Sequence, residues 1–324
     1  VHSVPYYRLE VALKTGGPVC VNGFWGAHLR SALGVALRES CCPFPGAPCD
    51  GCLLRFDCAF ATAWHTFVHP DDEESGLPPG VTTNRSHPFI LRAAKKTPDK
   101  VAAGRIIKFG MTILGEHTYK TAFWIVALKR MAARGLGKGT APLELVQVKR
   151  LLGKRSRILY DKSKRAVGRP GEPDMLRIGE LPARADSNRL VDLKLKFVSP
   201  LRLRRKDEEP AAPTPRLIWE AAVRRIQGMA SANGARPPEG WGGEYYSEEV
   251  SGCWSRIKQD RWSSSQKQRI PATGFAGEIE IADAPLGHVP WWNAAQLLGI
   301  GKMAAFGLGA FELEVKGGED SGGR

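Results

Sequence analysis

The chain contains no uninterrupted hydrophobic run of about 18 residues, which excludes an ordinary membrane-spanning helix. Its N-terminus lacks a charged segment followed by an apolar one, so we expect no secretory leader. Acidic residues are the minority, with 33 Asp and Glu against 47 Lys and Arg, and the net charge is +14 over 324 residues. We therefore expect a cytoplasmic protein without a membrane partner, and a polyanion such as nucleic acid as its ligand.

The sequence also lacks the short motifs of several enzyme classes. It contains neither a Gly-x-Ser-x-Gly elbow nor an HExxH zinc motif. Gly299, Gly301 and Ala304 fit the relaxed dinucleotide fingerprint, but a helical pattern precedes them and a strand pattern follows, which is the reverse of the required order. Lys302 is followed by Met303 rather than Ser or Thr, so a Walker loop is excluded as well.

A helix, a glycine-rich loop and a strand follow one another at 121–148 and again at 292–315. This duplication predicts two βαββαβ units, and hence an α+β fold with two ferredoxin-like (RRM-like) domains in tandem. The expected order is an N-terminal domain at 1–150 with a Cys-rich insert at 41–64, a basic helical insert or arm at 151–187, a C-terminal domain at 188–316 with the Gly-rich loop, and a flexible tail at 317–324.

The segment 145–169 concentrates positive charge, with nine basic residues and one acid, Asp161. Read as a helix, it places several of these cations on one broad face. A solvated helical face is one interpretation. The excess of charge over what solubility requires favours the other, a projecting arm that contacts phosphates without reading sequence.

Four cysteines with ligand-like spacing follow the first expected helix: Cys42, Cys49, Cys52 and Cys58, with Cys41 as an alternative to Cys42. The Cys-x-x-Cys pair supplies two thiolates from one turn, as tetrahedral zinc requires. The spacing predicts a structural zinc site. The alternative is a compact loop with buried free thiols, and in either case no open catalytic position is implied.

Several stretches occur in the order of one known family, among them FWGAHLRSALGVALRESC, FGMTILG, SPLRLRRK, DRWSSSQKQ, TGFAGEIEI and LLGIGKMAAFGLGAFELE. Over nearly its whole length the chain resembles the CRISPR-associated endoribonucleases of the RAMP superfamily that process precursor CRISPR RNA. The cysteine-bearing first domain and the basic insert are most similar to the variant associated with type IV systems.

This resemblance implies a protein that binds the hairpin of the CRISPR repeat RNA, cleaves it through attack of the 2′-hydroxyl, and retains the product within an effector complex of other CRISPR proteins. No cofactor is implied for catalysis. The family's proton carrier commonly lies near the first strand–helix junction, which makes His28 the first catalytic candidate, with Arg30 and Arg38 as phosphate or transition-state ligands. The lower-ranked alternatives are His65, His69, His87, His117 and His288.

The expected RNA-binding residues come from the basic segment, a strand near 256 and the C-terminal Gly-rich loop. They are Lys149, Arg150, Lys154, Arg155, Arg157, Lys162, Lys164, Arg165, Arg256, Arg261, Gly299, Gly301, Lys302, Gly307 and Gly309. Trp254 and Trp262 are candidates for stacking on unpaired bases or for core packing. Two other functions remain open: a non-catalytic RNA-binding subunit of the same complex, and a zinc-dependent DNA-binding regulator.

Overall fold

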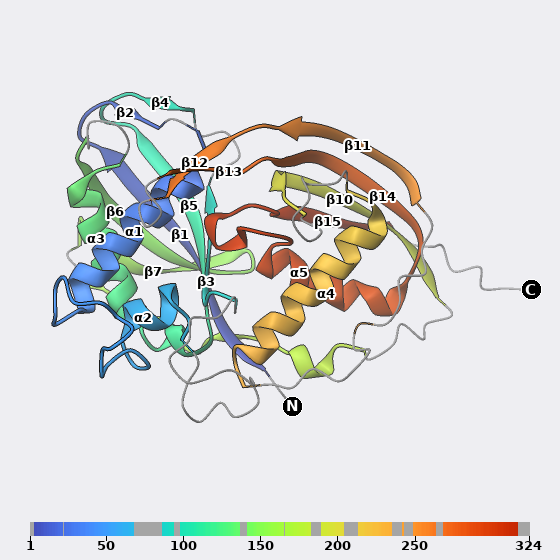
Figure 1. Cartoon of the computed structure of the whole chain (residues 1–324), viewed down its shortest axis with the longest axis horizontal. Coiled ribbons are helices and arrows are strands. Elements are labelled where there is room, and N and C mark those ends of the chain that lie inside the picture. The colour runs from blue at the N-terminus through green and yellow to red at the C-terminus, as the bar shows by residue number, and fades with distance from the viewer. Residues whose placement is uncertain are drawn as a thin grey trace, which may run out of the picture. The chain divides into compact units, whose positions relative to one another are not determined.

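The computed structural model describes residues 3–21, 23–67, 86–93, 98–136, 141–164, 166–182, 189–203, 213–234, 242, 249–263 and 268–316. The chain divides into two compact units (Figure 1). The first unit is Pro5–Met175 with Ser264–Lys267, and the second is Val1–Val4, Leu176–Ser263 and Gln268–Arg324. Among the described residues, no helix has both the length and the apolar character needed to cross a membrane.

The first unit is built on one antiparallel sheet with the strand order β3-β5-β1-β6-β7-β8, and β9 pairs with β1 at its side. The strands are β1 (Val4–Thr15), β3 (Phe89–Ala93), β5 (Ile106–Leu114), β6 (Leu143–Leu152), β7 (Arg155–Asp161), β8 (Ala166–Val167) and β9 (Asp174–Leu176), and β2 (Val19–Cys20) pairs separately with β4 (Lys100–Val101). The helices are α1 (Trp25–Cys41), α2 (Ala59–Trp64), a 3-10 turn η2 (Gly115–Thr118) and α3 (Thr121–Arg134). Taken in chain order, β1-α1-β3-β5-α3-β6 is the predicted βαββαβ unit.

The second unit repeats this plan with the strand order β11-β14-β10-β15. Its strands are β10 (Leu190–Leu201), β11 (Glu249–Ile257), β14 (Gly274–Pro285) and β15 (Phe311–Lys316), and β12 (Asp260–Ser263) pairs with β13 (Gln268–Pro271) as a separate hairpin. Its helices are α4 (Pro215–Ser231), α5 (Val289–Leu298) and the 3-10 turns η3 (Ile178–Glu180), η4 (Leu286–His288) and η5 (Ala304–Phe306). The order β10-α4-β11-β14-α5-β15 confirms the second predicted βαββαβ unit.

Each core forms where the central strand of the sheet turns its alternate side chains toward the helices. In the first unit, Leu9, Val11 and Leu13 of β1 are fully buried, together with the predicted leucine stripe of α1. In the second unit, Trp219 of α4 packs against Trp292 of α5, with ring centroids 5.1 Å apart. Helix α4 begins where Thr214 accepts a hydrogen bond from the Leu217 amide, ahead of a proline at the first helical position.

The basic segment is not helical, so the prediction of a helical insert at 151–187 is wrong. Residues 143–161 form the hairpin β6–β7, which extends the first sheet, and the compact first unit continues to Met175. Leu152 pairs with Arg155, so the hairpin closes through the two residues Gly153 and Lys154. Gly153 has a φ of +59°. A glycine in the first position of a two-residue turn is a strong hairpin signal, and the helical interpretation of the charges overlooked it.

The helix α1 passes so close to α2 that one of its residues must be glycine. A Cβ atom built on Gly34 would lie 2.7 Å from the indole ring of Trp64. Because Trp64 is itself stacked 4.5 Å from the Phe89 ring, it has little freedom to move aside.

We expect Gly34→Ala to lower the free energy of unfolding by about 1–3 kcal/mol through overpacking. The sign is informative, because an ordinary glycine-to-alanine change inside a helix stabilises by about 0.5–1 kcal/mol. Urea denaturation measures the effect. Ser31→Ala, at an exposed position of the same helix, is the control and should be neutral or slightly stabilising. A stabilised Gly34→Ala protein would contradict the close approach.

Candidate nucleic-acid interface

The β6–β7 hairpin carries an exposed group of cations at its turn. Lys154, Arg155 and Arg157 are all exposed. Arg150 differs, because only 4% of it is exposed: it donates to the Pro170 carbonyl at 2.7 Å and forms an ion pair with Asp174 at 3.3 Å. The predicted ligand Arg150 is therefore an internal anchor of the hairpin, whereas the three residues at the turn can reach a ligand.

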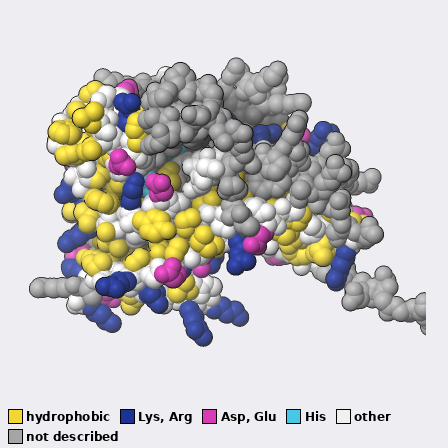
Figure 2. All heavy atoms as spheres, turned by 90° about the horizontal axis from the view of Figure 1, so that it is seen from below, with side chains coloured by type: hydrophobic (Ala, Val, Ile, Leu, Met, Phe, Trp, Pro, Cys, Tyr) yellow, Lys and Arg dark blue, Asp and Glu magenta, His cyan; other side chains and the backbone are white. Residues whose placement is uncertain are grey.

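The other cations predicted in this segment differ in their surroundings. Lys162 is exposed and forms an ion pair with Glu144. Lys164 is exposed, and Lys149 is half-buried on β6. Arg165 lies outside the described residues. Figure 2 shows Lys and Arg side chains projecting along one edge of the face in view, with hydrophobic side chains between them.

The open face of the first sheet, opposite the buried residues of β1, is also basic. Strand register places Glu10 beside Lys149 on β6 and beside Gly110 on β5, which in turn pairs with Arg92 on β3. Arg8 lies two residues before Glu10, and therefore on the same face. Burial lowers the pKa of Arg92, and the positive charge of Arg8 lowers it further.

Arg8, Arg92, Lys108 and Lys149 lie around Glu10 on this face, and Glu10 bonds Lys108 at 3.2 Å. Further along the strands, Lys14 pairs with Glu144 and Gln147 pairs with Asp161 on the same face, which still leaves more cations than carboxylates. Sequence reasoning missed Arg8, Arg92 and Lys108. The available signal was the alternation of polar and apolar residues along YYRLEVAL, which predicts the open face once the strand is recognised.

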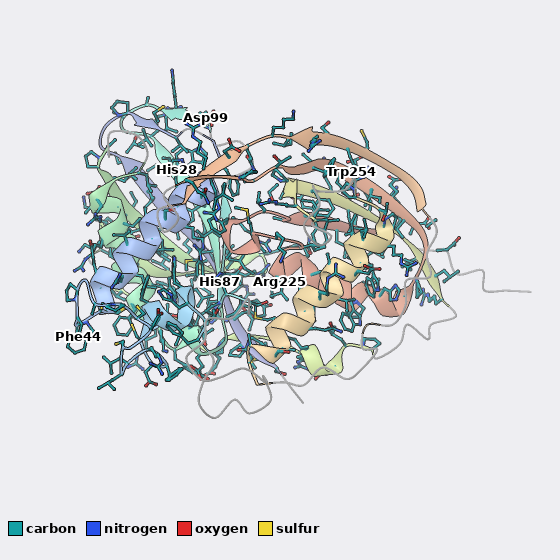
Figure 3. The ribbon with its side chains drawn as sticks, in the orientation of Figure 1. His28, Phe44, His87, Asp99, Arg225 and Trp254 are labelled. Carbon is teal, nitrogen blue, oxygen red and sulfur yellow. The ribbon has the colours of Figure 1, made fainter. Side chains whose placement is uncertain are left out.

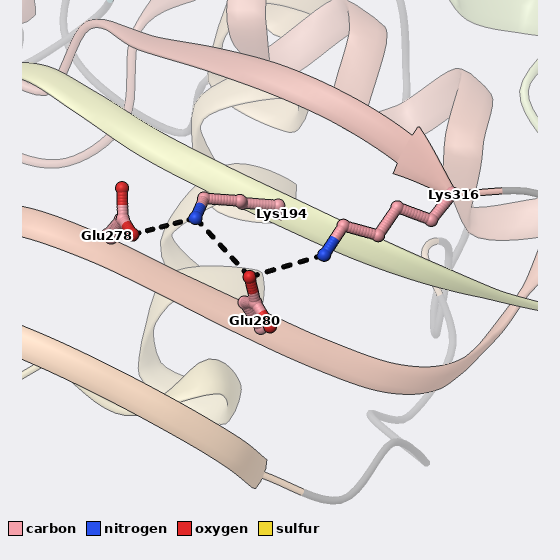
Figure 4. A network of polar contacts seen from close by, with 4 residues as sticks. All are labelled: Lys194, Glu278, Glu280 and Lys316. Atoms are coloured by element: carbon pink, nitrogen blue, oxygen red, sulfur yellow. Dashed lines mark hydrogen bonds and ion pairs between the residues drawn. The ribbon is translucent and has the colours of Figure 1, made fainter.

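The open face of the second sheet carries the opposite balance. On the central strand β10, Lys194 pairs in register with Glu280 and Glu314, and Lys196 pairs with Glu278 and Glu312. Lys194 Nζ lies 2.7 Å from Glu278 and 3.3 Å from Glu280, and Lys316 Nζ also reaches Glu280 at 3.3 Å (Figure 4). These bonds raise the pKa of Lys194 and lower that of Glu280. The lysines are neutralised by carboxylates, so this face does not attract a polyanion.

The predicted Gly-rich loop joins α5 to β15 and folds tightly on itself. Gly299, Gly301, Gly307 and Gly309 all have φ between +68° and +92°. The Ile300 amide donates to the Gly309 carbonyl at 2.9 Å, and the Gly309 amide donates to Pro200 at 2.9 Å. A Cβ on Gly301 would lie 2.5 Å from the Arg202 carbonyl oxygen, and one on Gly309 would overlap the Ile300 carbonyl. The glycines are therefore required by the shape of the loop.

Several amides of the loop are used in hydrogen bonds within the protein, so side chains are the main groups that the loop presents to a ligand. The Lys302 amide is already used, because it donates to the Arg202 carbonyl at 2.9 Å, while the Lys302 side chain is exposed. The Arg261 guanidinium lies 4.8 Å from the centroid of the Phe306 ring, and Arg202 Nη1 donates to Met303 Sδ at 3.3 Å.

Arg202 and Arg261 are close enough to influence one another. Burial lowers the pKa of Arg261, and the charge of Arg202 lowers it further. A phosphate near the loop would relieve this repulsion between like charges. Arg261 was predicted from the sequence, and Arg202 was not, although it lies in the SPLRLRRK stretch.

The strand β11 carries the remaining candidates of the second unit. Trp254, labelled in Figure 3, is half-buried, and its ring lies 5.5 Å from that of the buried Phe197, so it packs at the margin of the core. Arg256 is exposed two residues further along. The Trp262 side chain lies outside what the structure describes.

The three catalytic candidates on α1 are not brought together. His28 is half-buried in the first turns of the helix. Arg30 follows it by two residues, so the two point to different sides of the helix. Arg30 lies 5.1 Å from the ring centroid of Trp64 and 3.4 Å from His87 Nε2. Figure 3 shows His28 and His87 well apart. Arg30 is thus held in an aromatic site away from His28.

Arg38 lies further along α1 and contacts the Cys-rich insert. Its Nη2 donates to the Ala47 carbonyl at 2.5 Å, and its guanidinium lies 5.7 Å from the Phe60 ring. Because α1 rises about 1.5 Å per residue, Arg38 is roughly 15 Å from His28 along the axis. The contacts of Arg38 favour a role in anchoring the insert.

Two of the other histidines, His117 and His288, are buried in the cores. His117 is 3% exposed, and burial lowers its pKa to about 3. His288 is buried against Trp219, with ring centroids 4.1 Å apart, and burial lowers its pKa to about 4. His65 stacks on Phe67, and its pKa is also lowered by burial. His69 lies outside the described residues. Among the described histidines, His28, His65 and His87 are half-buried, and of these three only His28 lies in the first turns of α1.

The Cys-rich insert contains five of the seven cysteines, all of which are free thiols. Cys41 Sγ lies 3.9 Å from Cys58 Sγ, and this hydrogen bond lowers the pKa of Cys58 to about 5 and raises that of Cys41. Within the described part of the chain, no three His, Cys, Asp or Glu side chains are placed so that they hold a metal ion as they stand.

Two family models match the chain in succession. Residues 4–171, just over half of the chain, match an N-terminal domain model, AF_1859_N. Residues 195–311 match the model of the CRISPR-associated endoribonuclease Cas6. No curated protein matches the chain in a sequence search.

Solved structures share the fold at low identity. A Cas6-RT-Cas1–Cas2 complex matches with a TM-score of 0.56 and 13% identity, covering 97% of this chain and 29% of that one. A product complex of Thermus thermophilus Cas6 matches with a TM-score of 0.51 and 14% identity, covering 96% of this chain and 99% of that one. The chain thus spans under a third of the first relative and the full length of the second.

The shape of the Gly-rich loop can be tested with two alanine substitutions. We expect Gly309→Ala to destabilise the protein by more than about 2 kcal/mol, because the added Cβ combines a positive φ with a steric overlap. Gly46→Ala is the control: its φ is +87°, but nothing lies within 4 Å of the added atom, so it should cost only about 1–2 kcal/mol. Equal losses in thermal or urea unfolding would contradict the close approach at Gly309.

Proposed function

Because the chain belongs to the CRISPR-associated RAMP proteins, with an AF_1859_N domain followed by a Cas6 endoribonuclease domain, we propose that it is an endoribonuclease that processes precursor CRISPR RNA. The substrate is the repeat hairpin, and the product is retained as part of an effector complex with other CRISPR proteins. The observation that carries the proposal is the Cas6 match across β10–β15, the elements that build the Gly-rich loop and the cations around it.

The proposed reaction uses the RNA's own nucleophile and needs no metal. A base removes the proton of the 2′-hydroxyl, the 2′-oxygen attacks the adjacent phosphorus, and the bond to the 5′-oxygen breaks. An acid protonates the departing 5′-oxygen, which leaves a 2′,3′-cyclic phosphate. Histidine can transfer either proton near neutral pH. His28 is the proposed carrier because it is half-buried and lies in the first turns of α1, near the strand–helix junction where the family resemblance places the proton carrier.

Positive side chains of the second unit bind RNA in this proposal. Arg202, Arg261 and Lys302 at the Gly-rich loop contact phosphates of the RNA backbone. The cations of the β6–β7 turn and of the open face of the first sheet contact the RNA backbone, which makes binding dependent on salt. The exposed cysteine insert and the basic hairpin of the first unit support assignment to the type IV variant.

A non-catalytic RNA-binding subunit is the second candidate function. The observation in its favour is that several catalytic candidates are not available to a substrate. Arg30 and Arg38 are held in aromatic contacts, and His117 and His288 are buried. Such a protein would bind the repeat hairpin without cutting it. A DNA-binding regulator would instead prefer duplex DNA.

We expect the protein to cut labelled repeat RNA once in EDTA, and His28→Ala to slow single-turnover cleavage by about 10²–10⁴-fold, the usual contribution of a general acid or base. RNA affinity should be unchanged. The control is His65→Gln, at the residue that follows α2, and this variant should cleave RNA at the wild-type rate. Binding without any cut in the wild type would favour the non-catalytic subunit, and full activity in His28→Ala would exclude His28 as the proton carrier.

We expect neutralising Lys154, Arg155 and Arg157 to glutamine to weaken RNA binding and reduce the slope of log affinity against log salt, by about 0.7–0.9 for each phosphate that the protein no longer neutralises. The matched control replaces Lys196, Arg216 and Lys316 with glutamine. These three residues are exposed but lie away from the basic surfaces, and their replacement removes the same amount of charge. Filter binding over a salt series measures both. Equal losses of affinity in the two variants would show that only net charge matters and would contradict a role for the hairpin.

A further inference from the structure

Within the Cys-rich insert, residues 42–58 connect α1 to α2 as an irregular segment without a helix or strand. We propose that it binds one zinc ion through the thiolates of Cys42, Cys49, Cys52 and Cys58, and that this ion holds the insert on the first unit. The site is structural and separate from the proposed RNA chemistry.

All four thiols line one cavity of about 20 Å³. Its other walls are apolar: Pro43, Phe44, Ala47, Pro48, Leu54, Phe60 and Ala61. Cysteines are the only metal-ligating side chains of this cavity, and the cavity has no carboxylate side chain, so the site suits a soft cation better than Mg²⁺ or Ca²⁺.

The backbone already places the thiols near this point. The Cys52 amide donates to the Cys49 carbonyl at 3.1 Å, so the Cys-x-x-Cys pair lies on one turn. Cys42 directly follows the last residue of α1, and Cys58 precedes the first residue of α2. Two ligands therefore come from rigid helix ends and two from the turn. Closing the turn onto the helix ends completes a tetrahedral site, in which metal binding and ordering of the insert are coupled.

Cys41 is a neighbour of the site rather than a ligand. It does not line the cavity, and its Sγ donates to the Leu37 carbonyl within α1 at 3.1 Å. Its sulfur is 3.9 Å from that of Cys58, whereas a disulfide requires about 2.05 Å.

Two cations lie close enough to balance the charge of a bound zinc ion. Four thiolates around Zn²⁺ leave two negative charges, while Arg38 donates to the carbonyl of Ala47, which lines the cavity, and Lys120 donates to the Asp57 carbonyl, next to Cys58, at 3.0 Å. Apolar burial cannot fix the insert, because Leu53 is 96% exposed and Phe44 is 56% exposed. Irregular segments with so little core are commonly held by a disulfide or a metal, and all the cysteines are free.

The test measures zinc in the full-length protein purified under reducing conditions. We expect one zinc per chain, lost in Cys49→Ser and Cys52→Ser, and retained in Cys41→Ser and in Cys253→Ser outside the insert. In the wild type, native alkylation should spare the four ligands until a chelator is added, and zinc chloride should restore their protection. Trypsin should cleave the insert, at Arg55, faster in the chelated protein.

Three results would overturn the proposal. The first is a metal-free wild type whose insert thiols alkylate freely with or without added zinc. The second is iron with inorganic sulfide in place of zinc, and the third is a Cys41–Cys58 disulfide in the reduced preparation. Cleavage of repeat RNA is a separate readout, so a failure here leaves the proposed function intact, and the reverse also holds.

Discussion

The two-residue alternation of side chains along β1 and β10 is the constraint on which the rest of the structure depends. Each strand is central in its sheet, so it must fill a core on one side and leave the other side open. The odd-numbered residues of both strands form the cores. The charge of the even-numbered side chains is not constrained by core packing, and it differs between the units. Arg8 lies on the open face of one unit, and Lys194 with its glutamate partners lies on that of the other.

The open faces of the two units differ in charge, although the units share one topology, so we expect them to differ in how they bind RNA. The face around Arg8 and Arg92 has more cations than acids, whereas Lys194 and Lys196 each lie between glutamates. An RRM-like sheet is commonly expected to bind RNA on its open face, but the second sheet cannot do so by attraction of charge. In this unit, Arg202, Arg261 and Lys302 gather at the Gly-rich loop, away from the glutamates of the open face.

The sequence was sufficient for the fold because the fold rests on periodic signals. The leucine stripe of α1, the alternation in β1 and the repeated helix–glycine–strand pattern are all local, and each is confirmed. The prediction for the basic segment was wrong because charged residues alone show no helical or strand period. The segment was interpreted as a helix, whereas Gly153, with its positive φ, forms the turn of a hairpin. The environments of Arg30 and Arg38 were also beyond local reasoning, since Trp64 and Phe60 reach them from α2.

Helix α1 connects the two parts of the first unit that carry chemistry. His28 lies in its first turns, and Cys42 ends it, about 20 Å further along the axis at 1.5 Å per residue. A metal at the far end therefore cannot take part in proton transfer at His28. It can fix the C-terminal end of α1. Gly34 of this helix packs against Trp64, and Trp64 also contacts Arg30 and Phe89 of β3. The proposed zinc ion would therefore act on the candidate site only through this packing.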